Sequence, residues 1–174
     1  AQLPKTLISE GTATGEYVSY SDYRFSADGS RLAFAVTNGD GDKSLFVADL
    51  SSDTPGEAVR IETESVAVGV GGFALTPNGK GLAFHAEVDT DAWQLFYVSL
   101  DDNGSSDPEL VDDASGGYAV TWVTNSRVVY GAETQHVTRV LENGSFGEAQ
   151  VVRQYGTFSQ IHRPSQRLLL TNAV

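Results

Sequence analysis

Residues 23–50 read YRFSADGSRLAFAVTNGDGDKSLFVADL, and this stretch decides the fold. An aromatic-bearing strand leads through an Asp-Gly turn to an apolar strand, and an acidic loop then leads to a second apolar strand. Short strands joined in this order form an up-and-down antiparallel meander. We expect strands at residues 20–25, 31–36 and 45–50, followed by a weaker fourth strand at residues 58–61.

The same pattern returns in residues 73–100, which read FALTPNGKGLAFHAEVDTDAWQLFYVSL. Because Asn tolerates positive φ and Gly adopts it freely, Asn78-Gly79 predicts a tight hairpin turn between two strands. A third copy and a partial fourth copy keep the strand order while their sequence identity fades. The start of the second strand in each copy is marked by Arg31, Gly81, Arg127 and Arg167, at separations of 50, 46 and 40 residues.

Repeats of this length, each with four short strands, predict an all-β protein with the β-propeller fold. The strands at residues 32–36 and 95–98 are apolar on both faces, as expected where neighbouring blades cover a sheet from both sides. A two-sheet sandwich is the alternative, but it favours one wet face and leaves the repeat unexplained. We expect one domain over residues 1–174, with three full blades and one partial blade at about residues 18–61, 68–111, 117–152 and 156–174.

The incomplete fourth copy leaves open how the ring closes. Residues 3–9 would complete the last blade of a four-blade ring, or else the chain forms an arc of a larger propeller. An unclosed arc exposes a blade face and a sheet edge, so self-association and truncation are expected as readily as self-closure. The sequence has no Met, which indicates a processed protein, a domain or a fragment.

Two of the units resemble the repeats of TolB-type propellers. They are FSADGSRLAF with LFVADL at residues 25–34 and 45–50, and LTPNGKGLAF with LFYVSL at residues 75–84 and 95–100. The blade of that family reads aromatic-Ser-Pro-Asp-Gly before its apolar strands; the first unit has Ala27 in place of Pro, and the third and fourth units lack Asp-Gly. The resemblance implies the fold but not the function, because such blades occur in transport accessories, surface proteins and the gating domains of prolyl-oligopeptidase-like enzymes.

The charge of the chain excludes some partners. With 11 Lys and Arg against 23 Asp and Glu, the net charge is −12, which argues against a nucleic-acid surface. No apolar run is long enough to cross a membrane, so no membrane insertion is expected. The chain has no Cys and therefore neither a disulfide framework nor a thiolate metal site.

Acidic residues collect in the loops that a propeller would place on one face. These loops join the second strand to the third within a blade, or one blade to the next. We expect an acidic rim made of Asp40, Asp42, Glu62, Glu64, Glu87, Asp89, Asp91, Asp112 and Asp113. Trp93 adjoins this rim and is a candidate partner contact, whereas Tyr97, Trp122 and Tyr130 are expected in the core. Calcium would need several such oxygens, but solvated turns are the preferred interpretation.

The sequence has no catalytic constellation that we recognise. It lacks a Gly-x-Ser-x-Gly elbow, and its three His residues fall at non-equivalent places in the repeat, with His85 expected as a hydrogen-bonded core histidine. No catalytic residue, cofactor or metal site is assigned. The preferred hypothesis is a non-catalytic, periplasmic or secreted propeller that binds another protein or acts as a scaffold. The alternatives are an accessory propeller of a larger prolyl-oligopeptidase-like hydrolase and a glycan- or metal-binding module.

Overall fold

The computed structural model describes residues 16–54, 56–61, 69–89, 92–101, 104–113, 119–132, 135–154, 157–162 and 167–171. All regular elements in these ranges are β-strands, which confirms the all-β prediction. A search of the same ranges finds no helix of the length and apolarity that a membrane crossing requires. The strand expected at residues 3–9 lies outside them.

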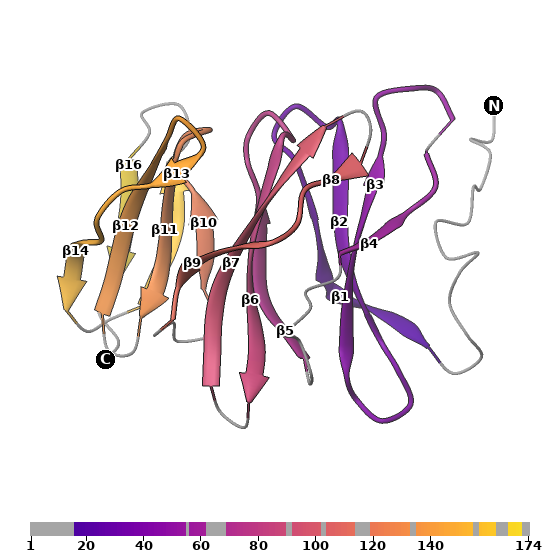
Figure 1. Ribbon diagram of the computed structural model, residues 1–174, viewed down its shortest axis with the longest axis horizontal. Coiled ribbons are helices and arrows are strands. Elements are labelled where there is room, and N and C mark those ends of the chain that lie inside the picture. Colours follow the sequence, from indigo (N-terminus) through magenta and orange to yellow (C-terminus); the bar gives the residue numbers. More distant parts are fainter. Residues whose placement is uncertain are drawn as a thin grey trace.

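The strands of the described ranges form four antiparallel sheets, which follow one another along the chain (Figure 1). Blade 1 consists of β1 (Tyr17–Phe25), β2 (Arg31–Thr37), β3 (Lys43–Asp49) and β4 (Val59–Ile61). Blade 2 consists of β5 (Gly69–Leu75), β6 (Gly81–Asp89), β7 (Ala92–Asp101), the short β8 (Gly104–Ser105) and β9 (Glu109–Asp112). Blade 3 consists of β10 (Val120–Trp122), β11 (Arg127–Ala132), β12 (Gln135–Glu142), the short β13 (Ser145–Phe146) and β14 (Gln150–Gln154). The last sheet pairs β15 (Thr157–His162) with β16 (Arg167–Thr171).

Blades 1 and 2 are two copies of one unit. In blade 1, Phe34 of β2 lies opposite Phe46 of β3, and their rings stack with centroids 5.5 Å apart. In blade 2, Phe84 of β6 lies opposite Phe96 of β7 and stacks in the same way at 5.8 Å. The two copies belong to separate sheets rather than to one continuous layer (Figure 1). The internal repeat read from the sequence is therefore a repeat of whole sheets.

The core lies between the blades. Ala33 and Ala35 of blade 1 pack in one apolar cluster with residues of blade 2 such as Phe84, and β1 contacts β5. On the other side of blade 2, Leu95 packs in a second cluster with Trp122 of blade 3, and β5 contacts β10. First strands are thus neighbours from blade to blade, and blade 2 buries both of its faces. This two-sided burial explains why the second and third strands have no polar face.

The first turns of blades 1 and 2 share one shape. In blade 1 the Ser26 hydroxyl donates to the Asp28 carboxylate at 2.6 Å, and the same carboxylate accepts the Ser30 amide at 3.0 Å. These hydrogen bonds, that from Ser26 first, lower the pKa of Asp28. In blade 2, Thr76 and Asn78 repeat the arrangement with a side-chain bond of 2.9 Å. The repeat motif therefore encodes a turn in which Ser or Thr bonds to the Asp or Asn two residues later.

The turn at Asn78-Gly79 differs from the expected tight hairpin. The amide of Thr76 donates to the Gly81 carbonyl and that of Gly79 to the Thr76 carbonyl, so the loop is longer than two residues. Of these two residues Gly79 alone has positive φ, at 68°, and the Asn78 side chain accepts the Thr76 hydroxyl within the turn. Two consecutive residues with positive φ occur instead at Asn143 and Gly144, between β12 and β13.

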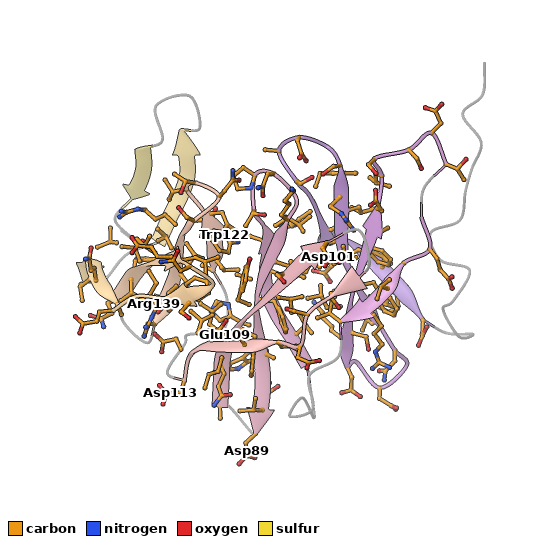
Figure 2. The ribbon with its side chains drawn as sticks, turned by 45° about the horizontal axis from the view of Figure 1, so that its top comes forward. Asp89, Asp101, Glu109, Asp113, Trp122 and Arg139 are labelled. Carbon is orange, nitrogen blue, oxygen red and sulfur yellow. The ribbon has the colours of Figure 1, made fainter. Side chains whose placement is uncertain are left out.

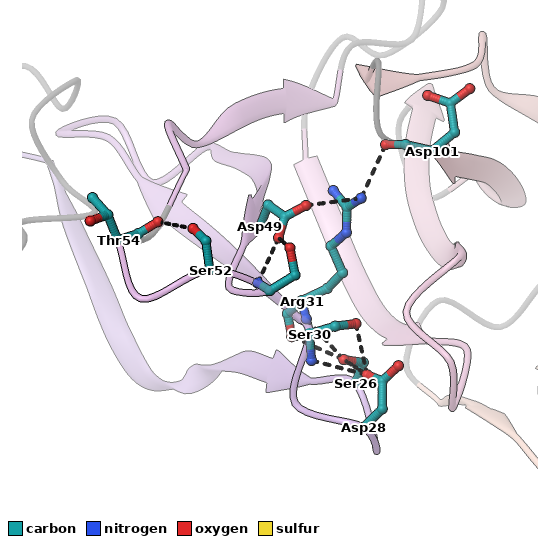
Figure 3. Close-up of polar contacts among 9 residues, drawn as sticks. Ser26, Asp28, Ser30, Arg31, Asp49, Ser52, Thr54 and Asp101 are labelled. Atoms are coloured by element: carbon teal, nitrogen blue, oxygen red, sulfur yellow. Dashed lines mark hydrogen bonds and ion pairs between the residues drawn. The ribbon is translucent and has the colours of Figure 1, made fainter.

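The turns also connect neighbouring blades. The Asp28 amide donates to the Pro77 carbonyl at 3.1 Å, and the Asn78 amide donates to the Asn125 side chain at 3.0 Å. Beside them, Arg31 pairs with Asp49 of its own blade at 3.2 Å and donates to the Asp101 carbonyl of blade 2 at 3.0 Å (Figure 3). Hydrogen bonds between turns thus run from blade 1 to blade 3 along this face.

Gly81 lies at a position that has little room for a side chain. A Cβ atom there would lie 2.6 Å from the Tyr97 hydroxyl and 2.7 Å from its ring, whereas blade 1 has Arg31 at this position and the smaller Val47 in place of Tyr97. Gly81→Ala should lower the free energy of unfolding by about 2 kcal/mol through overpacking. Urea titration of Gly81→Ala, Tyr97→Val and the double variant measures this effect.

The double variant should lose less stability than the two single variants summed, because the smaller valine side chain at position 97 would leave room for the new methyl group. Gly131→Ala is the matched control, since a Cβ atom at Gly131 of β11 would meet nothing within 4 Å. Additive losses in the double variant, or an equal loss in Gly131→Ala, would contradict the steric explanation.

Candidate functional site

A groove of about 460 Å³ opens between blades 1 and 2. Asp22 and Arg24 of β1 line one side, and residues 69–73 of β5 line the other. The loop between β2 and β3 contributes Gly41, and the first residue of β3 contributes Lys43. The paired ends of β6 and β7 contribute Glu87 and Trp93. We call this feature the inter-blade groove. It lies where the first strands of two blades adjoin, and concave sites between packed units of a fold are common places for ligands.

The groove carries charges of both signs. Lys43 pairs with Asp22 at 2.9 Å, so the start of β3, directly after the loop from β2, is held against β1. The Arg24 guanidinium lies 5.6 Å from the centre of the Phe73 ring, in a cation–π contact that links the two blades. With Glu87 the lining has two acidic and two basic side chains. The groove is therefore mixed in charge, unlike the acidic chain as a whole.

An irregularity in β5 exposes backbone to the groove. The pairing of β5 with β6 shifts register between Val70 and Phe73, so Gly71 and Gly72 are left out of the regular ladder. β1 shows a shift at the equivalent place, between Val18 and Tyr23. Bulges redirect backbone groups and often lie beside binding sites. Two glycines at such a bulge place peptide groups at the groove without side chains to cover them.

The predicted site residues take different places. Glu87 and Trp93 line the groove. Asp40 and Asp42 lie on the exposed loop next to it, where the Asn38 side chain accepts both of their amides at 2.9 Å. Asp89 and Asp113 are exposed at one end of blade 2 (Figure 2). Glu62, Glu64 and Asp91 lie outside the described residues.

Asp112 is placed differently from the expected rim. It lies in β9, with a side chain only 12% exposed, and pairs with Arg139 of blade 3 at 3.3 Å. Its carboxylate also accepts the hydroxyl of the fully buried Tyr130 at 2.5 Å, and Arg139 donates to the same hydroxyl at 2.9 Å. Burial, together with the bond to Asp112, raises the pKa of Tyr130, which therefore stays protonated. The three side chains join blade 2 to blade 3.

His85 is buried as expected, but without the expected hydrogen bond. Neither ring nitrogen has a hydrogen-bond partner in the described part of the chain, and the residue is fully buried in β6. Desolvation lowers the pKa of His85 to about 4, against weaker opposing effects of the Gly72 backbone and the Asp112 charge. His85 is thus neutral at pH 7.

No metal centre emerges from the described residues. Nowhere within them do three or more His, Asp or Glu side chains converge as a metal ion would require. The loop at residues 38–42, whose Asn-Gly-Asp-Gly-Asp sequence resembles the start of a calcium loop, is organised by Asn38, which also donates to the Asp42 carboxylate at 3.2 Å.

Sequence reasoning missed part of the groove. Asp22, Arg24 and Lys43 were not singled out, because nothing in the repeat distinguishes them from other polar residues. The clearest available signal was Gly-Val-Gly-Gly at residues 69–72, since glycines inside a strand often mark a bulge.

Comparison with known proteins bears on the fold. No protein-family model matches the chain, and no match was found among curated proteins. Among solved structures, a Mycobacterium tuberculosis puromycin-hydrolyzing peptidase matches with a TM-score of 0.63 at 12% identity, over 92% of this chain and 28% of the peptidase. TolB from Acinetobacter baumannii matches with a TM-score of 0.51 at 13% identity, over 85% of this chain and 35% of TolB.

A third matching structure is itself a β-propeller domain. The β-propeller domain of the Trilobed protease from Pyrococcus furiosus, described as having an open velcro topology, matches with a TM-score of 0.57 at 14% identity, over 84% of this chain and 46% of that domain. The chain has a TolB-like β-propeller fold. This propeller spans less than half the length of each of the three matched structures. At such low identity the likeness concerns the fold alone.

Proposed function

We propose that this chain is a non-catalytic protein-binding module that holds an extended segment of another protein in the inter-blade groove. The observation that carries the proposal is the combination of bare backbone at Gly71 and Gly72 with the Trp93 side chain in one groove. Backbone groups bind an extended strand by hydrogen bonds, and an aromatic side chain provides an anchor of large contact area. A groove with both features suits a peptide.

The charges of the groove support the same class of partner. Asp22, Glu87, Arg24 and Lys43 provide both signs, so a segment with charges of both signs fits better than a polyanion. The pairing of Lys43 with Asp22 serves to fix the loop and argues for a preformed surface. An extracytoplasmic location remains part of this proposal, and cell fractionation tests it.

Selection from a random peptide display library tests the proposed function. We expect enriched peptides to bind the wild-type chain and to lose at least tenfold in affinity, about 1.4 kcal/mol, on Trp93→Ala. Val59→Ala is the control, because Val59 is an exposed apolar residue of β4 that does not line the groove. Isothermal titration calorimetry with the enriched peptides provides the affinities.

Two results would count against the proposal. The first is a library that yields no peptide above background. The second is a set of enriched peptides that bind Trp93→Ala as tightly as the wild type.

An accessory propeller of a larger hydrolase is the second candidate. It is favoured by the fold likeness to a peptidase and to a protease propeller domain. The gene that encodes the chain distinguishes the two candidates, because a catalytic domain with a nucleophile elbow in the same reading frame would support the hydrolase.

A further inference from the structure

Glu87 and Trp93 lie side by side in the inter-blade groove. They are direct partners in the antiparallel pairing of β6 with β7, so their side chains share one face of the sheet, and both line the groove. Both residues are partly exposed. The Oε2 atom of Glu87 lies over the start of β5, 3.8 Å from the place that a Cβ atom would take at Gly69. A carboxylate and an indole thus meet a ligand together on the blade 2 side of the groove.

The two basic side chains of the lining are engaged within the protein. Lys43 pairs with Asp22 at 2.9 Å, which neutralises one acid and one base of the lining. The Arg24 guanidinium donates to the preceding backbone carbonyl at 2.7 Å and lies 5.6 Å from the centre of the Phe73 ring. Both cations therefore have structural contacts on the blade 1 side, and the charged group next to the indole on the blade 2 side is the carboxylate of Glu87.

Glu87 determines which side chain of a ligand suits the indole of Trp93. An apolar side chain on the indole would take the neighbouring carboxylate out of water without offering it a donor, and this costs free energy. A guanidinium suits both groups, because its plane stacks on an indole and its N–H groups form a fork that matches a carboxylate. The net charge of −12 also favours the approach of a cationic segment.

We propose that the inter-blade groove selects an extended peptide that carries an arginine, whose guanidinium stacks on Trp93 and donates to the carboxylate of Glu87. The peptide backbone then lies along the bulge at Gly71 and Gly72. This inference rests on the proposed function and adds the residue that the groove selects.

Nuclear magnetic resonance titration of the full chain tests the arginine anchor. The probes are two blocked pentapeptides of valine that differ at the central residue, which is arginine in one and its uncharged isostere citrulline in the other. The chain has two tryptophans, and the indole N–H of the buried Trp122 donates to the Ala74 carbonyl at 3.0 Å, so its signal is an internal control. We expect the arginine peptide to shift the Trp93 indole signal saturably while that of Trp122 stays in place. The citrulline peptide should bind about tenfold more weakly, because it cannot form the charged hydrogen bonds.

Two variants assign the preference to Glu87. Glu87→Gln keeps the size of the side chain but removes its charge, so it should lose about tenfold in affinity for the arginine peptide and less than about twofold for the citrulline peptide. Asp89→Asn is the matched control, because it removes one charge from the exposed end of the same strand outside the groove, and it should keep the preference.

Several results would overturn the arginine anchor. They are a wild type that binds neither peptide or binds both equally, a Glu87→Gln chain that still prefers arginine, and an equal loss in Asp89→Asn. Peptides from the display library that need Trp93 but carry no basic residue would support peptide binding in the groove and would still overturn the anchor.

Discussion

Replacing Arg139 with Met is expected to lower the free energy of unfolding by about 3 kcal/mol. The Met side chain retains much of the apolar stem but removes the cation that pairs with Asp112 at 3.3 Å and the donor to the Tyr130 hydroxyl at 2.9 Å. Asp112 would then be a largely buried carboxylate without its guanidinium partner. Urea titration at pH 7 measures the loss, with Arg60→Met as a control whose exposed side chain should change stability by less than about 0.5 kcal/mol.

The double variant Asp112→Asn with Arg139→Met separates charge from packing. It removes both charges of this ion pair, and the amide oxygen can still accept the Tyr130 hydroxyl, so we expect it to lose only about 1 kcal/mol. A double variant less stable than Arg139→Met alone would show that the guanidinium acts through packing, and the explanation by a buried charge would be wrong.

Acidification is expected to destabilise the protein through His85. Its pKa is lowered to about 4 in the folded chain from 6.5, so between these values the unfolded chain binds more protons than the folded one. The free energy of unfolding therefore falls as the pH drops from about 6.5 to about 4, by about 3 kcal/mol for this residue. Asp28 and Asp49 have lowered pKa values, so their contribution to the free energy of unfolding is lost only as the pH falls below 3.8.

Two substitutions of His85 test this assignment by urea titration at several pH values. His85→Leu and His85→Gln both remove the titrating group and should flatten the pH profile between about pH 6.5 and about pH 4.5. At about pH 7.5 only His85→Leu should gain stability, since it replaces two ring nitrogens that lack hydrogen bonds in the described structure with apolar atoms. A profile as steep in both variants as in the wild type would assign the acid sensitivity to other groups.

The architecture followed from the sequence because it depends on local pattern. Apolar strands and turn residues that appear at residues 25–50 and again at residues 75–100 were sufficient to predict an all-β propeller. The structure places these two copies in separate sheets. The predicted tight hairpin at Asn78 was wrong, although it also rested on local sequence. The dipeptide Asn-Gly favours a tight hairpin, but in the structure the Thr76 amide pairs with the Gly81 carbonyl and the Thr76 hydroxyl donates to the Asn78 side chain, so the loop is longer.

The candidate site was harder to predict because it depends on contacts between blades. Glu87 and Trp93 were predicted as site residues because they lie in or beside an acidic loop, and both line the groove. Asp112 resembled a rim residue in sequence, yet its partners Tyr130 and Arg139 come from the next blade. The bulge at Gly71 and Gly72 depends on strand register, which composition alone does not determine.

The hydrogen bonds between the first turns suggest how the repeat has diverged. The bond from Asp28 to Pro77 uses main-chain atoms alone, and that from Asn78 to Asn125 uses one side-chain oxygen. These contacts therefore depend on the shape of the loop more than on which amino acids build it. Successive units can therefore differ in sequence while their turns keep the same contacts. The third unit lacks the Asp-Gly pair, yet its turn at Asn125 still bonds to the turn of blade 2.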